Sequence, residues 1–234
     1  MCRADRQHSG FTHLRKSKVT NPIKAAIKAA AASFGYEFCR LNPTEREWKA
    51  QHAPALDFKD LIAVRSLATL SQLTLAECHF LGELIRSSDP KKPIIEIGSL
   101  YGWSTLVITL FKAPEQPLIT VDNYSWNSLG LTAEAHFTAN RMRLTEAIRD
   151  YNVRQVRMDK DEFYRTYDGG QPALFFCDAD HGYEATKADL VWASSVKAEI
   201  ICGDDYSQSK FPGVVRAVEE MGGAKKVVDE LFVL

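Results

Sequence analysis

Acidic residues follow almost every apolar run in the second half of the sequence. Five short runs of branched and aromatic residues predict buried strands, at 93–97, 118–121, 153–158, 173–177 and 198–202. A carboxylate lies at or just after the end of each run, in the order Glu96, Asp122, Asp159, Asp178 and the pair Asp204 and Asp205. Carboxylates that gather at one place repel one another and raise one another's pKa. The pattern therefore indicates a bound cation or a positively charged, hydroxyl-rich ligand.

Amphipathic helices separate these strands and must position the carboxylates. Helical spacing predicts helices at 74–87, 103–112, 132–149, 161–167, 183–194 and 213–221, and 227–234 supplies the last strand material. Strands that alternate with helices form a doubly wound α/β fold, in which helices cover both faces of a mostly parallel sheet. Ligands of such sheets bind beyond the carboxyl ends of the strands, where the acidic residues lie.

The first strand leads into a loop with two glycines four residues apart, Gly98 and Gly102. Gly98 lets the backbone turn sharply, and Gly102 lets a ligand approach the start of the next helix. Glu96, at the end of the strand, is costly to bury unless a cationic group pairs with it. The loop lacks the G-x-G-x-x-G pattern of dinucleotide folds, which disfavours a nicotinamide-dependent oxidoreductase. An ordinary strand-to-helix turn remains the alternative interpretation.

A second motif spans the fourth strand, the helix after it and the fifth strand. Its turn reads Asp178-Ala179-Asp180-His181-Gly182-Tyr183-Glu184, and the fifth strand ends in Gly203-Asp204-Asp205-Tyr206. Together with the glycine loop, this half resembles the class I S-adenosylmethionine-dependent methyltransferases of the type-24 domain, which have a mostly parallel, seven-stranded, Rossmann-like sheet. It is also similar to metal-dependent O-methyltransferases that act on catechols and sugars. The resemblance covers about 93–218.

The resemblance implies a role for each acidic strand end. Asp122 would hold the ribose hydroxyls, and the other residues around the cofactor would be Glu96, Gly98, Ser99, Gly102, Ser104, Asp159 and Asp178. A divalent metal would be held by Asp178, Asp204 and Asp205, and an all-oxygen set favours magnesium, manganese or calcium over zinc. In the alternative without metal, Asp204 and Asp205 merely cap the following segment.

His181 is the candidate general base, because an imidazole titrates near neutral pH and can take a proton from a hydroxyl. Asp180 is its candidate partner in a mechanism without metal. A competing interpretation gives His181 a structural role at the start of the helix. A non-catalytic cofactor-binding domain is the rival from another functional class. The acceptor that the resemblance implies is a hydroxyl on a small molecule or sugar.

Two loops border the expected site. The segment 123–130 is long and polar, which is typical of a lid, and three aromatic residues could stack on a ligand or fill the core: Trp103, Tyr124 and Trp126. A Pro-Gly-Gly turn usually precedes the fifth strand of the similar family, but here 195–198 reads Ser-Val-Lys-Ala. The change could shift the register of Asp204 and Asp205.

The remaining sequence suggests how the chain is divided and where it works. Residues 1–19 predict a disordered lead, 20–73 a helical extension and 74–234 the methyltransferase domain. A basic amphipathic helix at 20–35 could contact a membrane surface, the domain itself or a second subunit of a homo-oligomer. The formal net charge of −1 gives no reason to expect a nucleic-acid partner. Five cysteines without C-x-x-C spacing predict reduced thiols in a cytoplasmic protein. The polar, basic first 20 residues predict no secretory signal, and the absence of a long apolar run predicts no transmembrane segment.

Overall fold

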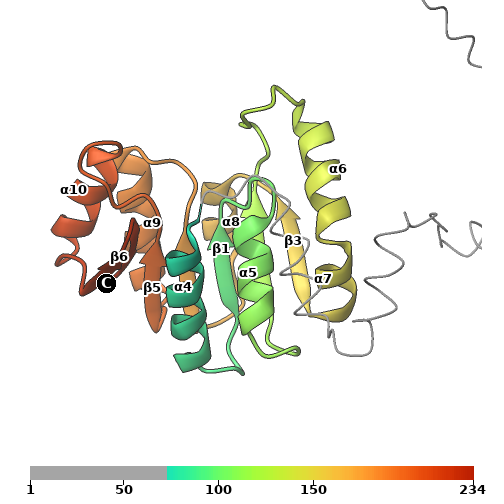
Figure 1. Ribbon diagram of the computed structural model, residues 1–234. Helices are drawn as coiled ribbons and strands as arrows, with labels where there is room; N and C mark the ends of the chain where they lie inside the picture. The colour runs from blue at the N-terminus through green and yellow to red at the C-terminus, as the bar shows by residue number, and fades with distance from the viewer. Residues whose placement is uncertain (1–72) are drawn as a thin grey trace, which may run out of the picture. The chain divides into compact units, whose positions relative to one another are not determined.

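Figure 1 shows the protein as a computed structural model, which describes residues 73–234. The lead expected at 1–19, and all of the extension expected at 20–73 except Leu73, lie outside this range. The described strands are β1 (Ile94–Ile97), β2 (Leu118–Asp122), β3 (Val153–Arg157), β4 (Leu174–Cys177), β5 (Ile200–Gly203), β6 (Lys226–Val228) and β7 (Leu231–Val233). They form one seven-stranded sheet in the order β3-β2-β1-β4-β5-β7-β6, in which β7 alone runs antiparallel to its neighbours. The predicted mostly parallel sheet is thus confirmed.

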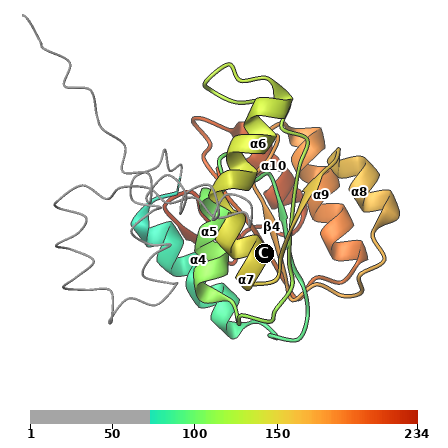
Figure 2. The same cartoon turned by 90° about the vertical axis from the view of Figure 1, so that its right-hand side faces the viewer.

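Helices cover both faces of this sheet (Figure 2). They are α4 (Leu75–Ser87), α5 (Trp103–Phe111), α6 (Ala133–Arg143), α7 (Thr145–Asp150), α8 (Lys160–Thr166), α9 (Tyr183–Ser195) and α10 (Pro212–Glu220). Successive residues of a strand point to opposite faces, so Ile94 packs in the cluster with α4 and α5, while Ile95 packs in the cluster with α8 and α9. The doubly wound arrangement follows from strands that are apolar on both faces.

The helix expected at 132–149 is broken in two. Leu144 ends α6 and begins α7, and its side chain is fully buried in the core. A Cβ on Gly102 would come within 3.1 Å of Leu144, so the break seats this side chain against the glycine loop. In Figure 1, α6 consequently rises beyond the ends of the strands, while α7 stays beside β3.

The register of β5 is unshifted despite the unusual turn before it. Lys197 takes the left-handed conformation, with φ of 57°, that a glycine would take after a helix. The amides of Lys197 and Ala198 donate to the carbonyls of Ser194 and Ala193, which is the Schellman pattern of a helix end. Gly203 therefore pairs with Cys177, and the acidic ends of β4 and β5 lie side by side.

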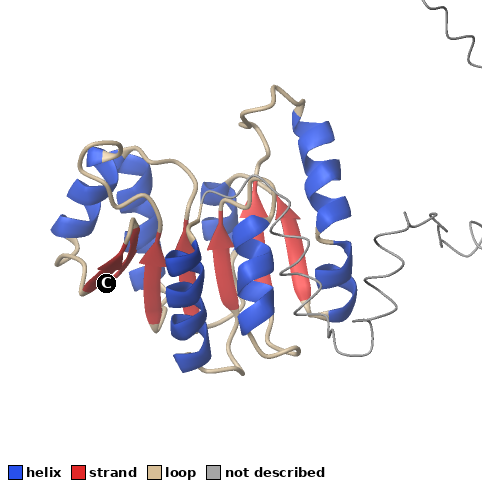
Figure 3. Cartoon of the chain, viewed as in Figure 1, coloured by secondary structure: helices blue, strands red, loops and turns tan. Residues whose placement is uncertain are grey.

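The last strand material forms a hairpin, because Asp229 turns the chain at φ of 51° between β6 and β7. The three cysteines within the described range, Cys78, Cys177 and Cys202, are buried free thiols. Among residues 73–234, none of the helices combines the length and apolar character that crossing a membrane requires. The arrowheads of β1 to β5 point to one edge of the sheet, as Figure 3 shows. The strand bounds place Glu96, Asp122, Asp178, Asp204 and Asp205 at or next to these strand ends.

Candidate functional site

The loop between β1 and α5 needs both of its glycines. Gly98 has φ of 89°, and a Cβ there would lie 1.8 Å from the carbonyl oxygen of Asp178. Gly102 has φ of 80° and caps α5 without a side chain. The loop is thereby pressed against the end of β4, in a conformation that L side chains rarely adopt.

Asp122 holds this loop from the end of β2. Its Oδ2 accepts hydrogen bonds from the amides of Ser99 and Leu100, at 3.0 and 2.9 Å, and its Oδ1 accepts one from the amide of Tyr124 at 2.6 Å. The carboxylate that the resemblance assigns to the ribose is therefore also a structural part of the loop. Oδ1 keeps one further lone pair for a ligand hydroxyl, whereas both lone pairs of Oδ2 are used, so the ribose role stays a prediction.

Glu96 lies beneath the loop and is fully buried. Its Oε2 accepts a hydrogen bond from the hydroxyl of Thr105 at 2.5 Å, while its Oε1 has no partner among the described residues. Burial raises the pKa of this carboxyl to about 7, although hydroxyl groups of α5, including that of Ser104, lower it. A buried carboxylate with an unpaired oxygen fits a cationic ligand group such as an ammonium.

Three side chains converge where β4 and β5 end. Asp178, His181 and Asp205 each offer a ligand atom, and these atoms lie within 4.8 Å of one another. Nδ1 of His181 lies 3.0 Å from Oδ2 of Asp205, and the ring of Phe211 packs on the imidazole at 4.6 Å between centroids. Burial raises the pKa of Asp178 well above its usual range, and the neighbouring Asp204 and Asp205 raise it further.

Asp204 lies at the same strand end but outside this group of three. Its side chain is buried, with an Oδ1 that has no partner in the described part of the chain. Burial raises its pKa to about 7, and the nearby carboxylates of Glu77 and Glu230 add to the effect. Of the three predicted metal ligands, Asp178 and Asp205 therefore converge, with His181 as the third group in place of Asp204.

Two other predicted site residues cap helices. The exposed Asp180 accepts a hydrogen bond from the amide of Gly182 at 2.7 Å, which turns the chain into α9. The exposed Asp159 accepts one from the amide of Asp161 at 2.9 Å and is the N-cap of α8. The catalytic role of Asp180 and the cofactor role of Asp159 stay predictions.

Sequence reasoning missed the face of α6 that holds the glycine loop. His136 and Asn140 approach the carbonyl oxygen of Leu100, at 2.8 and 2.6 Å, and Arg143 donates to that of Tyr101 at 2.6 Å. His136 and Asn140 are buried. Their spacing of four and three residues, on a helix with few apolar side chains, was the signal that could have identified this face.

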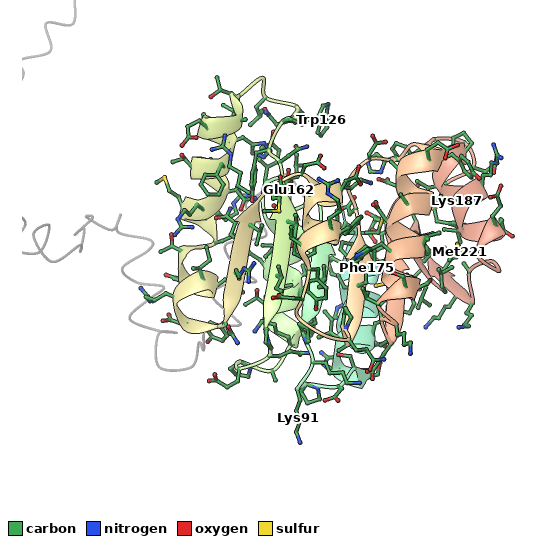
Figure 4. All side chains as sticks on the ribbon, turned by 180° about the vertical axis from the view of Figure 1, so that it is seen from behind. Lys91, Trp126, Glu162, Phe175, Lys187 and Met221 are labelled. Atoms are coloured by element: carbon green, nitrogen blue, oxygen red, sulfur yellow. The ribbon has the colours of Figure 1, made fainter. Side chains whose placement is uncertain are left out.

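The three aromatic candidates lie in different places. Tyr124 is fully buried below the loop, and burial raises its pKa to about 12. Trp126 is 65% exposed and projects from the segment expected to be a lid (Figure 4). Trp103 lines a small hollow beside the loop, together with Leu73, Ser99, Leu100, Tyr101, Ser104 and Asp178. Only Trp103 thus faces the hollow of the expected cofactor site.

Comparison with known proteins agrees with this geometry. A family model described as a methyltransferase domain matches residues 95–206, whereas no curated protein matches the sequence. Rv0187 from MTB, solved with a bound cofactor, is 20% identical with a TM-score of 0.58, covering 83% of this chain and 96% of its own. An O-methyltransferase from Bacillus cereus, in complex with SAH, is 16% identical with a TM-score of 0.55, covering 80% and 93%. CalS11, a TDP-rhamnose 3'-O-methyltransferase of calicheamicin biosynthesis, is 16% identical with a TM-score of 0.53, covering 84% and 96%.

The matched residues contain the glycine loop and both acidic motifs, and the sheet that carries them has the fold of these solved proteins. The unpaired buried oxygen of Glu96, beneath this loop, fits the ammonium of a methionine moiety. Residues 95–206 therefore match a methyltransferase domain, on a sheet with the fold of an O-methyltransferase solved with SAH.

Proposed function

We propose that this methyltransferase methylates a hydroxyl oxygen of a small molecule or sugar, with His181 as the general base and a divalent cation beside it. The convergence of Asp178, His181 and Asp205 at the strand ends is the observation that carries this proposal. S-adenosylmethionine supplies the methyl group as an electrophile. An alcohol oxygen is a poor nucleophile while it keeps its proton, so the protein must supply a base, a cation or both.

The base is supported by the contact between His181 and Asp205. The carboxylate of Asp205 lies on Nδ1 of the imidazole, which leaves Nε2 free to take the proton of the acceptor hydroxyl. A carboxylate in this position fixes the tautomer and the orientation of the ring. Asp205, rather than the expected Asp180, is therefore the partner of His181 in the mechanism without metal.

The residues at this place also fit a divalent cation. Asp178 and Asp205 would hold it, and the unpaired buried oxygen of Asp204 fits the third position that the resemblance implies. Carboxylate oxygens suit magnesium, manganese or calcium. The cation would lower the pKa of the acceptor hydroxyl and offset the repulsion among these acids.

The cofactor would be held on the β1 and β2 side of the same edge. Glu96 would pair with its ammonium, Ser99 and Ser104 line the hollow, and Asp122 keeps one free lone pair on Oδ1 for a ribose hydroxyl. The glycines at 98 and 102 let the glycine loop lie close against the end of β4 and against Leu144. The similarity to O-methyltransferases, one of which acts on TDP-rhamnose, supports oxygen as the target atom and a sugar as one acceptor.

The test compares Asp205 and Asp180, the two candidate partners of His181. We expect Asp205→Asn to lower turnover at least about 100-fold, because the base loses its orienting carboxylate and the cation loses a ligand. Asp180→Asn is the matched control and should keep turnover within a few-fold, since its side chain only turns the chain into α9. Methyl transfer from labelled cofactor to a panel of sugar nucleotides and catechols measures both, with chelator and then manganese added.

Manganese binding separates the two mechanisms independently of activity. Titration calorimetry with manganese alone should show one site that Asp178→Asn and Asp205→Asn weaken, while Asp180→Asn leaves it intact. A protein that binds no manganese and keeps its turnover in chelator would refute the cation and leave the His181 and Asp205 pair as the mechanism. Loss of turnover in Asp180→Asn but not in Asp205→Asn would refute the pairing itself.

A further inference from the structure

Four side chains form a closed ring of hydrogen bonds beneath the cofactor loop. Ser99 Oγ lies 3.1 Å from the hydroxyl of Tyr124, which accepts from Nε2 of Gln155 at 2.8 Å. The same Nε2 donates to Oδ1 of Asn140 at 2.9 Å, and Nδ2 of Asn140 donates back to Ser99 Oγ at 3.2 Å. The ring joins four elements: the loop after β1, the loop after β2, strand β3 and helix α6.

The hydrogen atoms of this ring have only one satisfactory arrangement. Gln155 uses its two amide hydrogens on Tyr124 and Asn140, and Asn140 uses its own two on Ser99 Oγ and the carbonyl of Leu100. One hydrogen bond remains, between the hydroxyls of Ser99 and Tyr124, and either hydroxyl could donate it. Tyr124 is fully buried, and its hydroxyl contacts no other acceptor among the described residues, so it must donate to Ser99. Otherwise a buried hydroxyl proton would be left unpaired, which costs about 1–3 kcal/mol.

This arrangement leaves the proton of the Ser99 hydroxyl free. Ser99 Oγ already accepts from Tyr124 and Asn140, so its own O–H can only donate outward. Ser99 lines the hollow beside the loop, as do Ser104 and Asp178. A directed donor at this place matches a ligand group that only accepts hydrogen bonds, and the anionic group of the methionine moiety is its carboxylate.

We infer that Asn140, Gln155 and Tyr124 are positioning residues that turn the hydroxyl of Ser99 into a fixed donor for the carboxylate of the cofactor. The inference rests on the cofactor assignment but not on the proposed acceptor, base or cation. The face of α6 described above also fixes the position of Ser99, because His136, Asn140 and Arg143 contact the carbonyl oxygens of Leu100 and Tyr101 in the same loop. Ground-state orientation of this kind acts on affinity for the cofactor and leaves the chemical step alone.

Gln155→Glu tests the inference by reversing the ring. A glutamate cannot donate to Tyr124, so Tyr124 donates to the glutamate, Ser99 donates to Tyr124, and the free proton is withdrawn from the hollow. We expect the Kd for S-adenosylhomocysteine to rise about 10-fold or more, since a hydrogen bond to a charged group is worth about 1.5–3 kcal/mol. Titration calorimetry on the folded protein measures this, with a thermal melt to confirm folding.

Two comparisons separate positioning from loss of structure. Gln116→Glu is the matched control, because Gln116 is also a buried amide that donates to two carbonyls, those of Asp89 and Lys92, but at the other edge of the sheet. It should leave the Kd within twofold. The ligand 5'-methylthioadenosine, which lacks the amino-acid part of the cofactor, should bind the unaltered protein and Gln155→Glu equally.

A double substitution decides whether the effect acts through Ser99. Ser99→Ala should raise the Kd about as much as Gln155→Glu, and the two together should cost no more than either alone. Additive effects, an equal loss with 5'-methylthioadenosine, or an unchanged Kd in folded Gln155→Glu would each overturn the inference. If Gln155→Glu does not fold, Asn140→Asp in the same cycle with Ser99→Ala decides by the same criteria. Absence of S-adenosylhomocysteine binding by the unaltered protein would overturn the cofactor assignment and the inference with it.

Discussion

The carboxylates at the strand ends have very different surroundings, and distance along the chain does not reveal which of them contacts His181. Asp180 is one residue from His181, yet its side chain turns back to the amide of Gly182. Asp205 is far along the chain, and the pairing of β4 with β5 brings it to the imidazole. The sequence identified the acidic edge, but the partner of His181 depends on a tight turn and a strand register that spacing does not encode.

Glu96 provides a prediction at this scale, through the pH dependence of stability. Its pKa is about 7 in the folded protein, against an ordinary value of 4.5. Between these pH values the folded state binds more protons than the unfolded state, so the free energy of unfolding falls as pH rises through this window. We expect Glu96→Gln to remove part of the fall, up to about 3 kcal/mol.

Denaturant titrations of ligand-free protein at several pH values between 4.5 and 7 measure this difference. Asp178 and Asp204 contribute to the slope in both proteins, so only the difference between the two slopes is assigned to Glu96. S-adenosylhomocysteine should also stabilise the unaltered protein more as the carboxyl group of Glu96 ionises, because the ligand carries an ammonium that this carboxylate would pair with. Identical slopes in the two proteins would show that Glu96 is not the group that titrates.

The helices and strands show how much of the fold can be predicted from the pattern of apolar residues. Runs of branched residues located β1 to β5, and the alternation with helices indicated the doubly wound sheet. The break at Leu144 was not foreseen, because both halves of 132–149 keep a helical period and only packing against Gly102 separates them. The ring beneath the loop was also out of reach, since its four members come from four separate segments.

The turn from α9 to β5 provides the prediction at the scale of elements. Lys197 holds a left-handed conformation that costs a non-glycine residue about 1–2 kcal/mol. We expect Lys197→Gly to raise the free energy of unfolding by up to about 1 kcal/mol, because the added freedom of glycine in the unfolded chain offsets part of the gain. Val196→Gly, one residue earlier at φ of −84°, should instead lower it. Denaturant unfolding measures both, and a loss of stability in Lys197→Gly would contradict this explanation of the register.

At the scale of the whole molecule, the candidate site lies at the carboxyl ends of the strands, and a buried group that stabilises the fold lies at their opposite ends. Ligand-facing carboxylates lie at the carboxyl ends of the strands, whereas Lys112 is buried at the opposite edge. Its ammonium donates to the carbonyls of Ala113, Pro114, Gln116 and Tyr151, at 3.1, 3.2, 2.8 and 2.5 Å. One side chain thus ties the connection between α5 and β2 to the end of α7. Figure 4 shows the two edges, with Trp126 at one and Lys91 at the other.

Lys112→Met should therefore lower stability without affecting the cofactor. Removing the ammonium leaves buried carbonyls unpaired, which we expect to cost about 2–4 kcal/mol. Lys91→Met is the control, because Lys91 is exposed and such changes usually stay within about 0.5 kcal/mol. Denaturant unfolding gives the stabilities, and calorimetry should return the same Kd for S-adenosylhomocysteine in all three proteins. A changed Kd in Lys112→Met would show that the two edges are coupled.

The acidic edge also acts before any contact forms. Glu96, Asp122, Asp178, Asp204 and Asp205 meet there, on a molecule whose formal net charge is only −1. The raised pKa values of Glu96, Asp178 and Asp204 reduce this charge at neutral pH, and the part that stays ionised attracts cations over about a Debye length, roughly 8–10 Å at physiological ionic strength. S-adenosylmethionine carries a net positive charge through its sulfonium, whereas the demethylated product is neutral overall. The field of this edge therefore steers the fresh cofactor inward and exerts no comparable pull on the spent one, an asymmetry that salt erases.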